Sequence, residues 1–174
     1  MSKNLVIVES PAKAKTINKY LGSDYEVLAS YGHVRDLVNK DGSVLPEDDF
    51  AMKWQLGERA GKTIKDIKSA VKKADALFLA PDPDREGEAI GWHLAKILKC
   101  DPEKTKRIIF TEITKTAIQK AVKNPTVIDI NMFNAQQARR ILDRIIGYLI
   151  SPILWKQIQS SYQEKKSKIV QKIP

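Results

Sequence analysis

Short apolar runs alternate with segments of helical periodicity over residues 1–124. The run Leu5-Val6-Ile7-Val8 is continuous and β-branched, which is typical of a strand buried on both faces of a parallel sheet. Ser10 and Pro11 follow as an N-cap and a first helical residue, and they predict a helix from about Pro11 to Leu21. The same reasoning predicts strands at 25–30, 76–80 and 107–110 and helices at 61–74, 86–98 and 114–122. The alternation indicates an α/β fold, with a mainly parallel sheet flanked by helices.

Two regions depart from this alternation. Residues 38–58 show no clear period and are expected to form a long loop. Beyond Asn124-Pro125, residues 134–148 have a helical pattern, and its predicted buried face consists of Ala135, Ala138, Ile141, Leu142, Ile145 and Ile146. We therefore expect an α/β domain over 1–124, a C-terminal helical extension over 125–155, and a basic, disordered tail over 156–174.

Charge and cysteine content narrow the possible partners. The chain has 174 residues and a net charge of +9. Basic residues dominate the C-terminal part, which favours a polyanion as partner, although a lysine-rich soluble surface explains the charge equally well. The single cysteine, Cys100, excludes disulfides within the chain and a cysteine-based zinc site. No apolar run approaches the roughly 20 residues of a membrane span, so we expect no membrane partner and a cytoplasmic location.

Four acidic residues follow two of the predicted strands. Asp82, Asp84 and Glu86 alternate directly after the run 76–80, and Glu9 follows the first strand. Alternate side chains can point to the same side, and the carboxyl ends of parallel strands meet at one edge of a sheet. Grouped carboxylates repel one another unless a cation neutralises them, so the pattern predicts a Mg2+ site at Glu9, Asp82, Asp84 and Glu86. The alternative is that the acids only stabilise the start of the next helix.

Several basic residues are weaker candidates. Lys13 lies one helical turn after Glu9 and could reach a phosphate at the helix N-terminus, although such lysines are more often solvated. His33 and Arg35 belong to a glycine-containing turn that is either a site or an ordinary surface turn. Three arginines, Arg139, Arg140 and Arg144, with Asp143 within salt-bridge reach, form a basic face that could follow a nucleic-acid backbone or simply be solvated.

Together these segments carry a resemblance to a known family. The stretches VIVESPAKAK (6–15), GHVRD (32–36), DPDREGE (82–88) and NAQQARRILDR (134–144) resemble the N-terminal part of bacterial DNA topoisomerase I. That is a type IA enzyme whose first domain has the Toprim fold. The resemblance runs in order from about residue 4 to Trp155, which makes it far more specific than the acidic motif alone.

The resemblance implies a function, and it implies roles for the acidic residues, for Lys13 and for the C-terminal helix. It implies that Asp82, Asp84 and Glu86 bind Mg2+, that Glu9 assists proton transfer beside the scissile phosphate, and that Lys13 assists phosphate chemistry. It implies that residues 139–144 belong to a region that grips single-stranded DNA. The family relaxes negatively supercoiled DNA without ATP: it cuts one strand through a tyrosyl-phosphate bond, passes another strand and reseals the gap. A monomer is expected.

This chain also departs from the family pattern. None of its tyrosines has the context of the family's nucleophile, a tyrosine followed closely by an arginine, and the expected Ser-Ala-Gly-Arg-Val-Gln stretch is absent after Trp155. We therefore expect the chain alone not to relax DNA. Two other functions stay open: a free-standing, metal-dependent Toprim nuclease and a non-catalytic nucleic-acid binder.

Overall fold

A four-stranded parallel sheet forms the centre of the domain in the computed structural model, which describes residues 3–40, 42–57 and 60–170. Its strands are β1 (Lys3–Val8), β2 (Tyr25–Ala29), β7 (Ala74–Leu79) and β8 (Lys106–Arg107), in the order β2-β1-β7-β8. All three pairings are parallel, and Val6 of β1 lies between Val27 of β2 and Phe78 of β7. The carboxyl ends of β1 and β7 therefore lie side by side.

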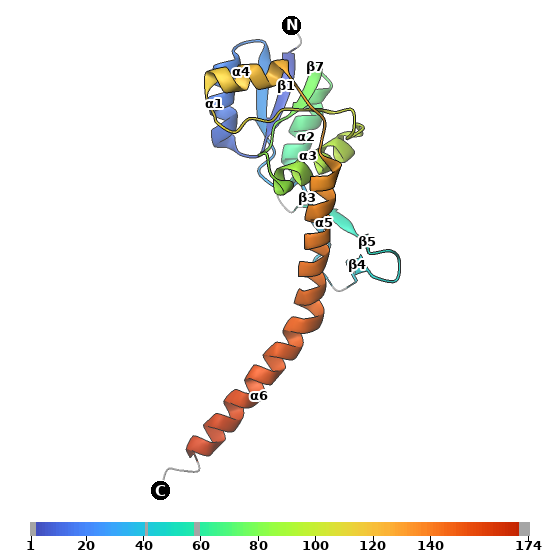
Figure 1. Cartoon of the computed structure of the whole chain (residues 1–174), viewed down its shortest axis with the longest axis vertical. Helices are drawn as coiled ribbons and strands as arrows, with labels where there is room; N and C mark the ends of the chain where they lie inside the picture. The colour runs from blue at the N-terminus through green and yellow to red at the C-terminus, as the bar shows by residue number, and fades with distance from the viewer. Residues whose placement is uncertain (1–2, 41, 58–59, 171–174) are drawn as a thin grey trace.

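Helices cover both faces of the sheet, as Figure 1 shows. On one face α2 (Ala60–Val71) and α3 (Arg85–Leu98) pack against Leu5, Ile7 and Leu79. On the other face α1 (Pro11–Leu21) and α4 (Lys115–Lys123) pack against Val6 and Phe78. The alternate side chains of β1 thus serve two separate cores, which explains why its sequence is continuously apolar. The predicted α/β fold is confirmed.

The described part of the region 38–58, expected to be a long loop, contains three short strands, and a fourth short strand, β3, lies just before it. β3 (Arg35–Leu37) pairs antiparallel with β6 (Trp54–Leu56), and β4 (Val44–Leu45) pairs antiparallel with β5 (Ala51–Met52). The prediction of a continuous long loop missed these strands, because strands of two or three residues are too short to show an alternating pattern.

The C-terminal part forms one long helical rod that projects away from the domain (Figure 1). It consists of α5 (Ile130–Ile145), a π-helical turn η1 (Ile146–Ile150) and α6 (Ser151–Val170). The predicted helical extension is confirmed, and Asp129 begins it by accepting hydrogen bonds from the backbone N–H groups of Asn131 and Met132. The expected disordered tail over 156–174 differs from the structure, because α6 is helical through Val170; residues 171–174 lie outside the described residues.

The buried face of α5 differs from the prediction. Ala135 and Ala138 are exposed and Leu142 is 58% exposed, whereas Phe133 is buried and stacks on Trp92 of α3 with ring centroids 4.2 Å apart. Two further residues on this inward face, Gln136 and Gln137, are also buried. A helical period identifies an apolar stripe, but the polar stripe of α5 is the one with specific partners on the domain.

Among the described residues, no helix combines the length and apolar character needed to cross a membrane.

Candidate active site

Glu9, Lys13 and Asp82 meet at the carboxyl edge of the sheet. Glu9 follows β1 and Asp82 follows β7, and these strands are neighbours. The Lys13 ammonium, one turn into α1, donates hydrogen bonds to Glu9 Oε1 and Asp82 Oδ1. Partial burial acts to lower the pKa of Lys13, but the hydrogen bonds that it donates to Asp82 and Glu9 outweigh burial and raise that pKa. The structure thus places a cation between two of the predicted acidic residues.

The same contact acts on Asp82 in the opposite direction. Burial acts to raise the pKa of Asp82, but the hydrogen bond from Lys13 outweighs it and holds that pKa below its ordinary value. Asp82 therefore stays an anion near neutral pH, as a ligand for a cation must.

Asp84 and Glu86 have other partners. Asp84 is the N-cap of α3, and its Oδ1 accepts a 2.7 Å hydrogen bond from the Gly87 N–H. Glu86 Oε2 accepts a 3.1 Å hydrogen bond from Gln136 Nε2 of α5 and lies 3.5 Å from His33 Nε2. Asp84 thus performs the capping role that the alternative interpretation assigned to it. Across residues 3–40, 42–57 and 60–170, no three acidic, histidine or cysteine side chains are grouped as ready-made metal ligands.

One buried oxygen at this edge still suits a cation. Glu9 Oε2 is buried and has no hydrogen-bond partner within the described residues. A buried carboxylate oxygen normally has a partner, and a hard divalent ion is a suitable one. Glu9 and Asp82 therefore fit the donor chemistry of Mg2+, although Lys13 is the cation between them in this structure.

A buried ion pair lies beneath the acidic turn, and the sequence analysis missed it. Arg107 Nε donates a 2.9 Å hydrogen bond to Glu88 Oε1, and the two side chains are 0% and 2% exposed. Arg107 Nη2 also donates to the Asp82 carbonyl oxygen at 2.8 Å, and Glu88 Oε2 accepts from the Asp129 N–H at 3.0 Å. Burial lowers the pKa of Arg107, while the negative Glu88 opposes that shift. The only signal in the sequence is an arginine at the start of the otherwise apolar run 107–110.

Gly87 brings α3 close to the same turn. A Cβ atom at this position would overlap the Asp82 carbonyl oxygen and lie 2.9 Å from the carbonyl carbon. The glycine is therefore required by the close approach of two backbone segments and not by an unusual φ angle.

His33, which lies beside Glu86, lines a small hollow together with Arg35. Arg35 lies over the Trp54 ring, with its guanidinium carbon 5.6 Å from the ring centroid. The ring of Trp54 contacts the buried His93 ring edge-on, with ring centroids 4.5 Å apart. Burial, and after it electrostatic repulsion from the Arg35 side chain, lowers the pKa of His93 to about 3, so this imidazole is neutral at physiological pH.

The polar residues of α5 do not form one basic face. Arg140 pairs with Asp36 of β3, and this hydrogen bond lowers the pKa of Asp36 although burial acts to raise it. Arg144 points toward the domain as well, where it donates to Asn39 Oδ1 at 3.5 Å. Arg139 and Asp143 are exposed and form a 3.7 Å ion pair with each other. The residues predicted to bind DNA therefore lie on two sides of the helix.

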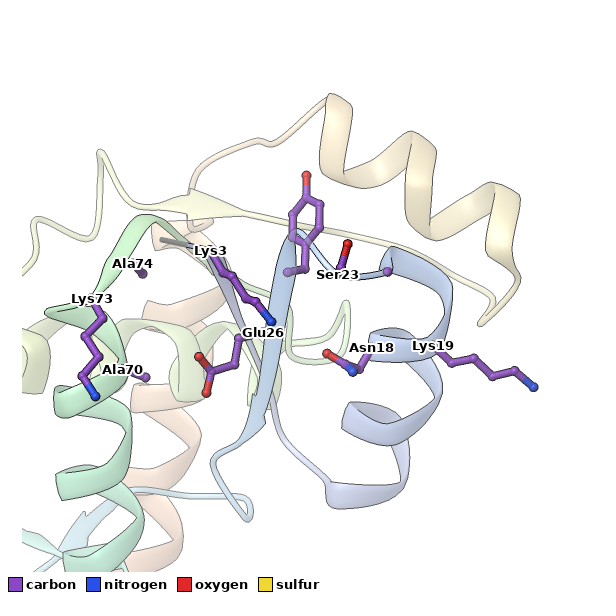
Figure 2. A pocket seen from close by; sticks show the side chains of 10 residues that line it. Lys3, Asn18, Lys19, Ser23, Glu26, Ala70, Lys73 and Ala74 are labelled. Atoms are coloured by element: carbon purple, nitrogen blue, oxygen red, sulfur yellow. The ribbon is translucent and has the colours of Figure 1, made fainter. Parts of the chain in front are cut away.

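A separate hollow of about 780 Å³ lies at the opposite edge of the sheet, where the strands begin (Figure 2). Lys3, Lys73 and Glu26 line it, and the C-terminal ends of α1 and α2 border it. Helix C-termini favour cations, which accounts for the lysines without a bound phosphate. This hollow is remote from the candidate acidic residues.

Comparisons with known proteins agree with this geometry. A model of the Toprim domain family matches residues 4–113. The chain belongs to the Toprim domain family. It is 56% identical over 160 residues to DNA topoisomerase 1 of Rickettsia felis, an alignment that covers 88% of this chain and 20% of that protein. It is 55% identical over 163 residues to DNA topoisomerase 1 of Xylella fastidiosa, an alignment that covers 91% of this chain and 20% of that protein.

A solved structure supports the same relationship. Full-length topoisomerase I from Thermotoga maritima matches with a TM-score of 0.81 and 48% identity, over 87% of this chain and 26% of that one. The resemblance to bacterial DNA topoisomerase I is thereby confirmed. This Toprim chain spans about a fifth of the length of the curated relatives it matches.

Proposed function

We propose that this chain is the Toprim part of a type IA DNA topoisomerase, which relaxes negatively supercoiled DNA by Mg2+-dependent, ATP-independent cleavage, passage and rejoining of strands. The observation that carries the proposal is the meeting of Glu9, Lys13 and Asp82 at the ends of two neighbouring strands. Two carboxylates with an ammonium between them suit a phosphodiester whose oxygens change charge during cleavage.

Each of these side chains has a proposed role. The Lys13 ammonium would neutralise a phosphate oxygen, and Glu9 would hold or move the proton of the attacking or leaving hydroxyl. Glu9, Asp82, Asp84 and Glu86 would hold the Mg2+ ion, which would position phosphate oxygens and balance charge. The proposal is supported by the unpaired Glu9 Oε2 and by the low pKa of Asp82.

Helix α5 is the proposed support for single-stranded DNA. Arg139 is exposed and would exchange its ion pair with the exposed Asp143 for a phosphate, while His33 lies beside Glu86 and shares a small hollow with Arg35. Arg140 and Arg144 are held by partners on the domain, which fixes the direction of α5 relative to the acids. Since no tyrosine here has the family's nucleophile context, we propose that the chain alone does not relax DNA.

Mg2+ titration by calorimetry tests the metal proposal. The unchanged chain should bind Mg2+, and Asp82→Asn should weaken binding about tenfold or more because it removes one anionic ligand. Glu103→Gln removes a charge from an exposed acid outside the site and should leave binding unchanged. Equal effects of the two substitutions would show that Mg2+ responds only to total charge.

Two DNA assays test the proposed single-strand binding and the proposed inability of the chain alone to relax DNA. Binding to single-stranded DNA should weaken with salt, and Arg139→Gln should reduce the slope of log affinity against log salt by roughly one. Supercoiled plasmid should stay unchanged in the presence of the chain and Mg2+. Free 5′-phosphate products from labelled DNA, lost in Asp84→Ala, would instead establish the nuclease function.

A further inference from the structure

Tyr31 occupies a backbone conformation that tyrosine rarely adopts. Its φ is +61° and that of the following Gly32 is +84°, so two consecutive residues are left-handed. This conformation is unfavourable for a bulky side chain, whereas Asn and Gly tolerate it. Strain of this kind persists where surrounding structure fixes it, and it gathers at ligand-binding sites.

Hydrogen bonds hold the strained turn against the end of β1. The Ser30 N–H donates to the Val8 carbonyl oxygen at 2.8 Å, and the Gly32 N–H donates to the Glu9 carbonyl oxygen at 3.0 Å. The second acceptor belongs to a candidate catalytic residue. Tyr31 is therefore fixed at a defined position beside the Glu9–Lys13–Asp82 group.

The Tyr31 ring does not contribute to the hydrophobic core. Tyr31 is 68% exposed and lines an open hollow of about 860 Å³, together with His33, Lys62 and Thr63. His33 also contacts Glu86, so the hollow directly adjoins the acidic turn. A strand that passes the acids would meet an open aromatic ring in this hollow, with the positive charge of Lys62 and the negative charge of Asp66 at its border.

We propose that Tyr31 is a stacking platform for an unpaired nucleobase of single-stranded DNA, next to the nucleotide whose phosphate lies at Glu9, Lys13 and Asp82. The inference rests on the proposed function and adds a subsite to it. An exposed aromatic face with a neighbouring cation is how proteins hold single strands without reading their sequence. Lys62 supplies the charge for the adjoining phosphate. A purely structural turn would be less strained with Asn or Gly at position 31.

Two substitutions separate the ring from the turn. Tyr31→Asn removes the ring and keeps a residue that tolerates the left-handed conformation, while Tyr31→Phe keeps the ring. The probe is a short single-stranded DNA that contains 2-aminopurine, and its affinity is measured by fluorescence anisotropy at one fixed salt concentration. We expect Tyr31→Asn to bind about tenfold more weakly, as for the loss of one base stack, and Tyr31→Phe to bind like the unchanged chain.

Three controls make each outcome decisive. The 2-aminopurine fluorescence should be quenched by the unchanged chain and by Tyr31→Phe, but not by Tyr31→Asn. Tyr162→Asn alters another exposed tyrosine, on α6, and should not affect binding. Thermal unfolding should show that Tyr31→Asn is at least as stable as the unchanged chain. Equal single-strand affinity of Tyr31→Asn and the unchanged chain overturns this subsite alone, whereas no binding by the unchanged chain overturns the proposed function as well.

Discussion

The buried Glu88–Arg107 pair gives a sharp test of what supports the acidic turn. Replacement of Glu88 by Gln keeps the size of the side chain but removes its charge. The two Glu88 oxygens accept hydrogen bonds from Arg107 and from the Asp129 N–H, and Gln offers a single acceptor for those two donors. The guanidinium of Arg107, 0% exposed, would then be a buried charge without its counter-ion.

The expected cost is large relative to the stability of a small domain. Loss of one partner from a buried ion pair costs about 3–5 kcal/mol, because an uncompensated charge stays inside the protein. Total stabilities are typically about 5–15 kcal/mol, so Glu88→Gln should remove a substantial share. We expect a loss of about 3 kcal/mol, at the lower end because Gln can retain one of the hydrogen bonds.

Urea unfolding followed by far-UV circular dichroism measures this loss. The midpoint should fall while the slope of free energy against urea stays constant. Glu103→Gln makes the same chemical change at an exposed site and should alter stability by less than about 0.5 kcal/mol. The combined substitution Glu88→Leu and Arg107→Met should cost about 2 kcal/mol less than the sum of the two single changes. A loss below about 1 kcal/mol for Glu88→Gln would refute the reasoning.

Three further predictions concern the same edge of the sheet and the helices behind it. Lys13→Met should tighten Mg2+ binding several-fold in calorimetry, because the ammonium no longer competes for two carboxylates; unchanged or weaker binding would contradict this. Gly87→Ala should destabilise the chain by several kcal/mol in urea unfolding because its Cβ would overlap the Asp82 carbonyl, whereas Gly61→Ala, with open space in α2, should be neutral or stabilising. In the folded chain His93 has a pKa of about 3, whereas in the unfolded chain it binds a proton below about pH 6.5. The free energy of unfolding should therefore fall as the pH falls from about 6.5 toward 3. Between pH 7 and pH 5 the unchanged chain should lose about 2 kcal/mol more than His93→Gln, and equal losses would contradict the assignment.

The elements that the sequence predicted best are those with local signals. Helix α1 has the predicted bounds because Ser10 and Pro11 mark its start and Gly22 follows its end. Strand β1 is recognisable because both of its faces are buried. The inward face of α5 was predicted wrongly, because a local sequence pattern cannot show that Gln136 donates a hydrogen bond to Glu86 of α3.

The candidate site was predictable to a similar degree and for the same reason. Acids at the ends of two strands were expected at one edge, and the structure brings Glu9 and Asp82 to the same lysine. The contact between Lys13 and Asp82 was not expected, because the sequence shows only that Lys13 lies one helical turn after Glu9. The role of Arg107 was missed entirely, since its partner Glu88 lies on another element and nothing in the sequence links the two.

The acidic turn and helix α5 are joined at two points, and this accounts for the orientation of the helix. Glu86 binds Gln136 in the middle of α5, while Glu88 binds the Asp129 N–H at its start. Both acids belong to the first turn of α3, so a single short segment fixes the position and the direction of α5. The polar stripe must then face the domain, and the apolar stripe with Leu142 stays exposed. Under the proposed function, a DNA strand held along α5 would therefore keep a constant register with a phosphate bound at the acidic turn.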